Sequence, residues 1–438
     1  MSMNPEFRRN LWLEVTKPRL VGMPAVLGAV LFLAYLMPGA RPLDTMVGAS
    51  LALFGVIVML WGTRLASESV VSEVRDRTWD SQRMSSIGPW AMTWGKLFGS
   101  TAYTWYGGIL CLAAYLVLAI GDAKDRPLIT MALFASAGLY GQATAILVSM
   151  QAIRKERRYD RSMASAFFVV GIAVSWIVIS LSVSASYPVT WFGMDFSNKD
   201  FVLLTVLAFL GWTVWGIYRL MRAELQMHNG PFVWLAFTCF IAFYFSGFVS
   251  DPEPAIRINT GFAVAFIVTL FLTYAMALSE RKDPVAYRRL IILYERRDWA
   301  RLAHGLPCWT VTLLPVFAAA FGMFLTALPN TPLTWTATGY RFFIVASFLF
   351  LLRDLGLLLY LNFTKSPKRA DMFFVLALAM LYGVIPGIMK GLDLDLLAAL
   401  FWPMWDQYSS TALPAAAVEA LLVMTLLVKR WKGLYADA

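Results

Sequence analysis

The sequence predicts an all-α integral membrane protein with about twelve transmembrane helices. Of the 438 residues, 59% are hydrophobic and only 15% are charged, so the chain is far more apolar than a soluble domain. Its apolar runs are continuous and about twenty residues long, the length that crosses ~30 Å of hydrocarbon. The strands of a transmembrane barrel would instead alternate apolar and polar residues over about ten positions. Lipid is therefore the expected solvent for most of the surface.

A short helix is predicted ahead of the first span. Asn4 can cap a helix that begins with Pro5 and stops before Pro18. Its apolar residues share one face, as they do in helices that lie in the membrane interface. We therefore assign residues 1–19 to an amphipathic interfacial helix. The alternative is an ordinary basic flank of the first span.

The spans then follow one another along the chain. Length and hydrophobicity place the twelve spans at residues 20–37, 46–66, 97–119, 128–150, 164–184, 201–221, 231–249, 259–278, 307–327, 341–360, 371–389 and 414–428. The last of them is short. Because no small-residue cleavage site follows the first apolar run, we expect that run to remain as the first span.

Basic residues gather in alternate loops between the predicted spans. Of the 37 Lys and Arg residues, 29 fall on one side of the membrane and 7 on the other, and Arg353 lies within a span. By the positive-inside rule, this distribution predicts that both termini are cytoplasmic, in a bacterial inner membrane. Orientation of the chain thereby accounts for the net charge of +10, so nucleic acid is not an expected partner.

Loop lengths predict two halves of six helices each. The long cytoplasmic loops 67–96 and 279–306 occupy equivalent places after the second span of a half. The longest loops on the other side, 185–200 and 390–413, both lie between the fifth and sixth spans of a half. This arrangement favours a parallel repeat. The predicted halves are residues 20–225 and 226–438.

The first long loop carries a motif that resembles a known family. The residues concerned are Glu73, Arg75, Arg77, Thr78, Trp79 and Asp80, followed by Gly95 and Lys96. They resemble the loop of ABC-2 type permeases, in which a Glu-Arg pair precedes Gly-Thr-Trp-Glu/Asp and a Gly-Lys opens the third helix. Arg77 stands where that family usually has Gly, and residues 84–86 stand where a Thr-Pro turn is common. The resemblance covers residues 1–225, with 226–438 as a second half.

The resemblance implies the membrane subunit of an ABC transporter, working as an exporter. In that family the loop holds a coupling helix that docks into a separate cytoplasmic ATPase, so two ATPase copies are expected partners and a homodimer is the main variant. Trp79 among charged neighbours would supply an aromatic anchor inside a polar rim. The nearest approach to a P-loop is Gly95-Lys96, where Leu97 replaces Ser or Thr, so we expect no enzyme activity and no cofactor in this chain.

The second long loop is the other candidate contact for an ATPase. Its helical periodicity sets aromatic and aliphatic residues among arginines. The candidate docking residues are Tyr287, Arg288, Arg289, Tyr294, Arg296 and Arg297. A basic amphipathic helix lying on anionic lipid is the competing interpretation, and the sequence leaves both open.

Polar residues within or at the ends of the predicted spans are costly in lipid and often functional. These residues are Gln142, Arg353, Asp354, Lys390 and Glu419. Arg353 is a candidate partner for Glu419 across the helix bundle, either as a structural ion pair or with a role in substrate binding or gating. The three cysteines and two histidines have no ligand spacing, so neither a metal site nor a disulfide framework is indicated.

Two other classes compete with the permease. A twelve-helix secondary transporter also has two parallel halves, but it usually has a long central loop, whereas this chain has a short one at 222–230. A membrane-embedded transferase would show paired aspartates or a His/Asp group; the nearest approach is Asp76 and Asp80, which lie among arginines. The substrate cannot be deduced from the sequence.

Overall fold

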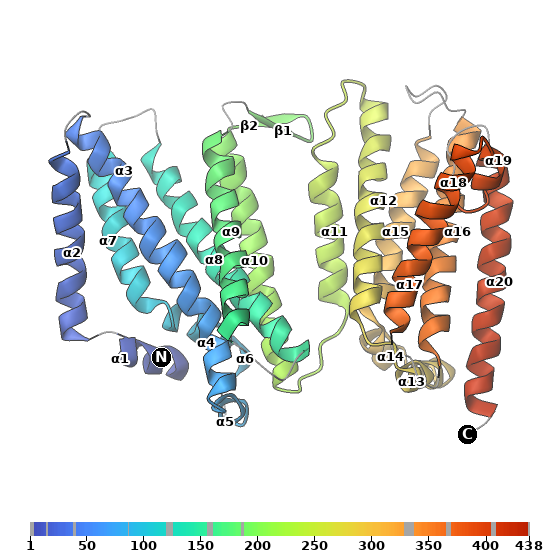
Figure 1. Ribbon diagram of the computed structural model, residues 1–438, viewed down its shortest axis with the longest axis horizontal. Helices are drawn as coiled ribbons and strands as arrows, with labels where there is room; N and C mark the ends of the chain where they lie inside the picture. The colour runs from blue at the N-terminus through green and yellow to red at the C-terminus, as the bar shows by residue number, and fades with distance from the viewer. Residues whose placement is uncertain are drawn as a thin grey trace. The chain divides into compact units, whose positions relative to one another are not determined.

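The chain is a helical multi-pass membrane protein, as the sequence predicts (Figure 1). The computed structural model describes residues 4–14, 16–37, 41–85, 87–119, 126–155, 161–184, 188–327, 337–364, 369–403 and 409–436. Within these residues, eleven helices are long and apolar enough to cross a membrane. A further apolar helix, Phe232–Ser246, has 15 residues and is about 22 Å long, so the prediction of twelve spans stays a prediction.

The helices form two compact units, each with its own apolar core. The first unit comprises the chain up to Val189 together with Asp195–Asn229, and the second comprises Thr190–Met194 and the chain from Gly230 onward. In each unit we call the end of the helices that carries the long loop, 67–96 or 279–306, the loop end. A two-stranded sheet is formed by β1 (Val189–Trp191) and β2 (Met194–Phe196).

The first unit is built around one very long helix. Its helices are α1 (Pro5–Glu14), α2 (Lys17–Tyr35), α3 (Pro42–Phe54), α4 (Thr63–Arg75), α5 (Trp79–Arg83), α6 (Pro89–Trp94), α7 (Ala102–Ala119), α8 (Pro127–Lys155), α9 (Arg161–Ser184) and α10 (Asn198–Glu224). A π-helical segment, Gly55–Gly62, joins α3 to α4 in a continuous helix of 34 residues. That helix is about 50 Å long, well beyond the ~30 Å of hydrocarbon, so α4 carries the first loop out past the membrane.

Gln142 on α8 satisfies the backbone of this π-helical segment. Its Nε2 donates to the carbonyl of Val58 at 3.0 Å, and its Oε1 accepts from Trp105 Nε1 at 2.9 Å. The side chain is fully buried. π-helical turns disturb the regular backbone ladder, and a buried carbonyl without a partner is costly in lipid. The intramembrane residue Gln142 therefore has an internal structural role.

The second unit has a shorter first helix and a longer last helix than the sequence predicts. Its helices are α11 (Phe232–Ser246), α12 (Pro254–Ser279), α13 (Pro284–Glu295), α14 (Trp299–Gly305), α15 (Cys308–Leu325), α16 (Ala337–Asn362), α17 (Ala370–Ala379), α18 (Ile385–Gly391), α19 (Asp395–Ala398) and α20 (Ser409–Ala436). The prediction of a short last span at 414–428 is wrong, because α20 has 28 residues and includes Pro414. Helices in lipid tolerate an internal proline when neighbouring groups satisfy the backbone.

The end of α11 is closed by the turn between β1 and β2. The backbone N–H of Phe192 donates to the carbonyl of Gly247 at 2.7 Å, and Trp191 Nε1 donates to the carbonyl of Tyr244 at 3.0 Å. These carbonyls belong to the last turn of α11 and the residue after it, where a helix has no backbone donors of its own. The hairpin thus supplies partners that the short helix lacks.

Candidate functional site

A buried lysine joins three parts of the first unit at its loop end. Lys96 lies on a π-helical segment, Gly95–Gly99, between α6 and α7, and only 1% of it is exposed. Its Nζ is 3.1 Å from Glu6 Oε1 on α1, and it forms a second ion pair with Glu73 on α4. The helix at the N-terminus, the start of the first loop and the beginning of the third span therefore meet at one cation.

Two further side chains bind the carboxylates that pair with Lys96. Arg9 NH2 lies 2.7 Å from Glu73 Oε1 and 3.1 Å from Glu6 Oε1. Gln82 of α5 donates from Nε2 to Glu73 Oε1 at 2.8 Å. We call Glu6, Arg9, Glu73, Gln82 and Lys96 the Lys96 cluster. Its two carboxylates and two cations neutralise each other, which is the condition under which charges are tolerated away from water.

Two glycines allow α1 to reach the cluster. A Cβ atom on Gly95 would lie 2.5 Å from Glu6 Cγ, and one on Gly99 would lie 2.9 Å from Asn10 Nδ2. Glu6 and Asn10 are four residues apart, as are the glycines, so one face of α1 lies along one face of the π-helical segment. Asn4 caps α1 by accepting from the N–H of Glu6 at 3.1 Å, as predicted.

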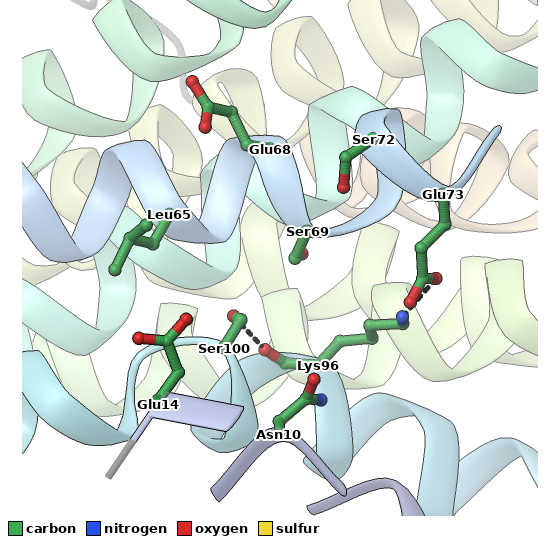
Figure 2. Close-up of a pocket in the computed structure, with 9 residues that line it drawn as sticks. All are labelled: Asn10, Glu14, Leu65, Glu68, Ser69, Ser72, Glu73, Lys96 and Ser100. Atoms are coloured by element: carbon green, nitrogen blue, oxygen red, sulfur yellow. Dashed lines mark hydrogen bonds and ion pairs between the residues drawn. The ribbon is translucent and has the colours of Figure 1, made fainter. Parts of the chain in front are cut away.

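A polar groove of about 220 Å³ opens beside the Lys96 cluster. It is lined by Asn10, Glu14, Leu65, Glu68, Ser69, Ser72, Glu73, Lys96 and Ser100 (Figure 2). Three carboxylates and three hydroxyls make its lining hydrophilic, so it does not suit an apolar substrate. In the part of the chain that the structure describes, no three His, Cys, Asp or Glu side chains are grouped to hold a metal ion.

The structure divides the residues of the first-loop motif into two sets. Glu73, Gly95 and Lys96 lie within the Lys96 cluster or directly beside it. The exposed members are Arg75, Arg77, Thr78 and Asp80. These four side chains, together with the exposed Met84, form the outer surface of the first loop. Any partner that docks on this loop would meet them first.

Trp79 does not offer the exposed anchor that we expected. Its side chain is 5% exposed and belongs to the same core cluster as Val70 and Met92. Its ring centroid lies 5.9 Å from Lys96 Nζ, a cation–π contact. The turn after α4 redirects the chain, so α5 begins with its aromatic ring facing the core. Trp79 therefore holds the loop on the unit.

The turn after α4 has a left-handed residue where the resembled family has glycine. Arg77 has φ +58°. The N–H of Arg77 donates to Val74 O at 3.2 Å, and the N–H of Thr78 donates to Glu73 O at 2.9 Å. This is the Schellman pattern, whose left-handed position favours glycine. The departure of Arg77 from the family motif thus falls at the position where glycine would be conformationally preferred.

The second loop repeats this local structure. Arg297 has φ +56°, its N–H donates to Tyr294 O at 3.0 Å, and the N–H of Asp298 donates to Leu293 O at 3.0 Å. α5 begins at Trp79 and α14 begins at Trp299. The shared signal in the sequence is Arg-x-Trp, at 77–79 and again at 297–299. We did not use that signal in the sequence analysis, and Trp299 was missed for this reason.

The candidate residues of the second loop also divide into inward and outward sets. Tyr287 points inward, where its hydroxyl accepts from Trp309 Nε1 at 3.1 Å. Burial raises the pKa of Tyr287 to about 12, so this phenol is neutral at physiological pH. The outward set comprises Arg288, Arg289, Tyr294, Arg296 and Arg297, all of which are exposed.

A second group of charged residues lies within the spans of the second unit. Arg353 NH1 is 2.5 Å from Glu419 Oε2, which confirms the expected pair between α16 and α20. Arg353 also binds its neighbour Asp354, with NH2 2.8 Å from Oδ1. The hydroxyls of Tyr274 and Tyr382 both donate to Asp354 Oδ2 at 2.7 Å. We call these five residues the Arg353 network.

Sequence analysis missed the two tyrosines of the Arg353 network. A tyrosine in an apolar span gives little signal, because its ring packs like phenylalanine until a hydroxyl partner is known. Lys390 is exposed at the end of α18 and is not part of the Arg353 network.

Comparisons of the chain with protein-family models, with curated proteins and with solved structures found no match.

Substituting Arg77 with Gly should stabilise the protein. The left-handed conformation costs an ordinary residue about 1 kcal/mol relative to glycine, so Arg77→Gly should raise the unfolding temperature in detergent. Arg75→Gly is the matched control: it removes a neighbouring arginine from regular helix and should lower stability by about 1 kcal/mol. Size-exclusion chromatography after heating measures both. A loss of stability in Arg77→Gly would contradict the assigned backbone.

Removing the buried cation Lys96 alone should destabilise the protein far more than removing Lys96 together with its partner Glu73. Lys96→Met leaves Glu6 and Glu73 beside a single arginine and should cost about 3–5 kcal/mol. The double substitution Lys96→Met with Glu73→Gln leaves the balanced pair of Glu6 and Arg9, so most of the stability should return. The same heating assay distinguishes the two variants. Equal losses in both would show that charge balance is not what Lys96 provides.

Proposed function

We propose that the chain is the membrane subunit of an ABC transporter of the ABC-2 type. Its first loop would extend into the cytoplasm and bind a separate ATPase there. The observation that supports this most directly is the Lys96 cluster, which ties the first loop firmly to α1 and to the start of the third span. Because breaking a buried ion pair is costly, these contacts would allow a force on the loop to reach both helices.

The geometry suggests how force would pass from the loop into the membrane. α4 continues without a break into α3, so movement of the exposed turn at Arg75 and Arg77 displaces the whole helix Pro42–Arg75. The ion pairs from Lys96 to Glu73 and Glu6 carry the same movement to α1 and to the beginning of the third span. ATP-driven closure of docked ATPases would then rock the helices as packed bodies, in the direction of export.

The remaining parts of the proposal follow from orientation and from the repeat. By the positive-inside rule, we propose that both termini lie on the cytoplasmic side of a bacterial inner membrane, so that the loop end of each unit would face the ATPases. The equivalent places of the two long loops, 67–96 and 279–306, support an internal repeat of two six-helix halves. Two ATPase copies would serve one chain or a homodimer. ATP and Mg²⁺ would bind to that partner, so this chain itself is not assigned an enzyme activity.

Charge reversal on the exposed turn should release the ATPase. Tagged protein is purified from native membranes in mild detergent, and its partners are identified by mass spectrometry. The double variant Arg75→Glu and Arg77→Glu should recover about tenfold less ATPase than wild type, because like charges would then face the docking surface. Arg288→Glu with Arg289→Glu is the matched control on the second loop and should retain the ATPase that docks on the first loop. If wild type recovers no ABC ATPase, the permease proposal is contradicted.

A secondary, ion-coupled transporter is the second candidate, and the Arg353 network favours it. Arg353 and Asp354 are buried within a span and pair with Glu419. Two carboxylates share one guanidinium, so the formal charge of the group is −1 within the membrane. Ionisable groups at such positions commonly lie on ion or proton pathways. An ion pair with a purely structural role would need only one carboxylate for the guanidinium and would be neutral.

The two candidates give opposite results in liposomes that contain only this protein. A pH-sensitive dye is trapped inside, and a panel of amphipathic substrates is added. An ion-coupled transporter should change the internal pH without any ATPase, and Glu419→Gln should abolish that change. Lys390→Gln, which alters a charge outside the Arg353 network, should leave it intact. No pH change with any substrate is the result expected of an ABC permease.

A further inference from the structure

The second loop exposes apolar side chains that a loop in water would bury. No residue of α13 or α14 is buried. The large exposed apolar side chains are Val285, Ile291, Ile292, Tyr294 and Trp299, each 38–70% exposed. Arginines stand between them along the chain. Exposed apolar groups rimmed by polar ones mark a surface that another phase or molecule covers.

The first loop is a natural comparison, because it has the same turn but a different surface. Within residues 67–96, the exposed large apolar residues among those described are Met84, Trp90 and Trp94, while Val70, Val71 and Trp79 are buried. That loop has four basic and four acidic residues and no net charge, whereas 279–306 has seven basic and four acidic residues, a net charge of +3. Net positive charge thus accompanies the exposed apolar groups on the second loop and not on the first.

Two of the exposed apolar groups of α13, Val285 and Ile292, form a strip with basic edges, whereas Tyr294 shares the face of Tyr287, seven residues before it. Val285 and Ile292 are seven residues, or two helical turns, apart and therefore share one face. Arg289 and Arg296 share the same spacing and lie along one side of that strip, and Arg288 lies on its other side. Tyr287 faces the opposite way, into contact with Trp309 and Phe363. The strip therefore points away from the unit's own core.

We propose that α13 and α14 lie on the membrane surface and bind anionic lipid headgroups. α12 ends at Ser279 and α15 begins at Cys308, and both are candidate spans, so the loop is held at the level of the headgroups. Helices of this composition bury their apolar strip among the acyl chains, with arginines reaching outward to phosphates. Tyrosine and tryptophan favour the same layer.

Charge decides between lipid and a protein partner for this surface. Each arginine near an anionic bilayer contributes about 1 kcal/mol, so a net charge of +3 draws the second loop to the membrane, whereas the first loop, with no net charge, gains nothing. Lipid is also always present at the ends of the spans, while an ATPase would leave the strip in water whenever it dissociated. This inference goes beyond the proposed function and holds equally for an ion-coupled transporter.

A spin label on the strip tests the proposal directly. Cys111, Cys239 and Cys308 are replaced by Ala in the full-length protein, and a nitroxide is attached at Val285→Cys. The protein is placed in nanodiscs of phosphatidylcholine with or without phosphatidylglycerol. In anionic discs the label should be severalfold more accessible to oxygen than to a water-soluble nickel complex. The label at Ser81→Cys, exposed on the first loop, is the control and should meet nickel in both discs.

The arginines supply the second arm of the experiment. Adding Arg288→Gln, Arg289→Gln and Arg296→Gln to the labelled protein should return the Val285 site to nickel accessibility in anionic discs. If the wild-type strip is already open to nickel in anionic discs, it does not lie on the membrane and the proposal fails. Protection from both oxygen and nickel would also overturn it, because a protein surface rather than lipid would then cover the strip.

Discussion

A buried ammonium group between two carboxylates sets the architecture of the first unit at its loop end. Because an unpaired charge is costly to bury, Glu6 and Glu73 must remain beside Lys96. They come from positions 90 and 23 residues earlier in the chain, so one cation fixes two distant segments. The N-terminal helix is consequently a packed part of the unit, and the first loop has a rigid base although its outer surface is exposed.

The π-helical segments place backbone groups where distant side chains can reach them. In Gly55–Gly62, the carbonyl of Val58 accepts from Gln142. In Gly95–Gly99, the carbonyl of Gly95 accepts from Asn10 Nδ2 at 3.4 Å. Both contacts join the segment to another helix: the first lies within the helix that carries the first loop, and the second lies at the start of the third span. Such irregular turns are frequent at functional sites.

The spans were predictable because the thickness of the bilayer imposes a length on every apolar run. The pair of Arg353 and Glu419 was predictable for a related reason: charges within spans require partners. The inward direction of Trp79 and Lys96 was not predictable, because in sequence they stand among charged residues that resemble a solvated loop. The burial of Lys96 depends on Glu6, which lies far away in the chain, and that of Trp79 on a core cluster that includes Met92. The π-helical segments have no periodic signal at all.

The two long loops show that tertiary partners, more than local backbone, decide what a loop presents. Both end a helix at a left-handed arginine and begin the next helix at a tryptophan. Trp79 packs in a core cluster that contains Met92, with Lys96 beside its ring. Trp299 instead packs on Tyr294 of its own loop, with ring centroids 5.6 Å apart. The first loop therefore exposes charged side chains, and the second exposes apolar side chains and arginines. In a transporter driven from the first loop, a second loop held on lipid would supply the fixed point that any rocking movement requires.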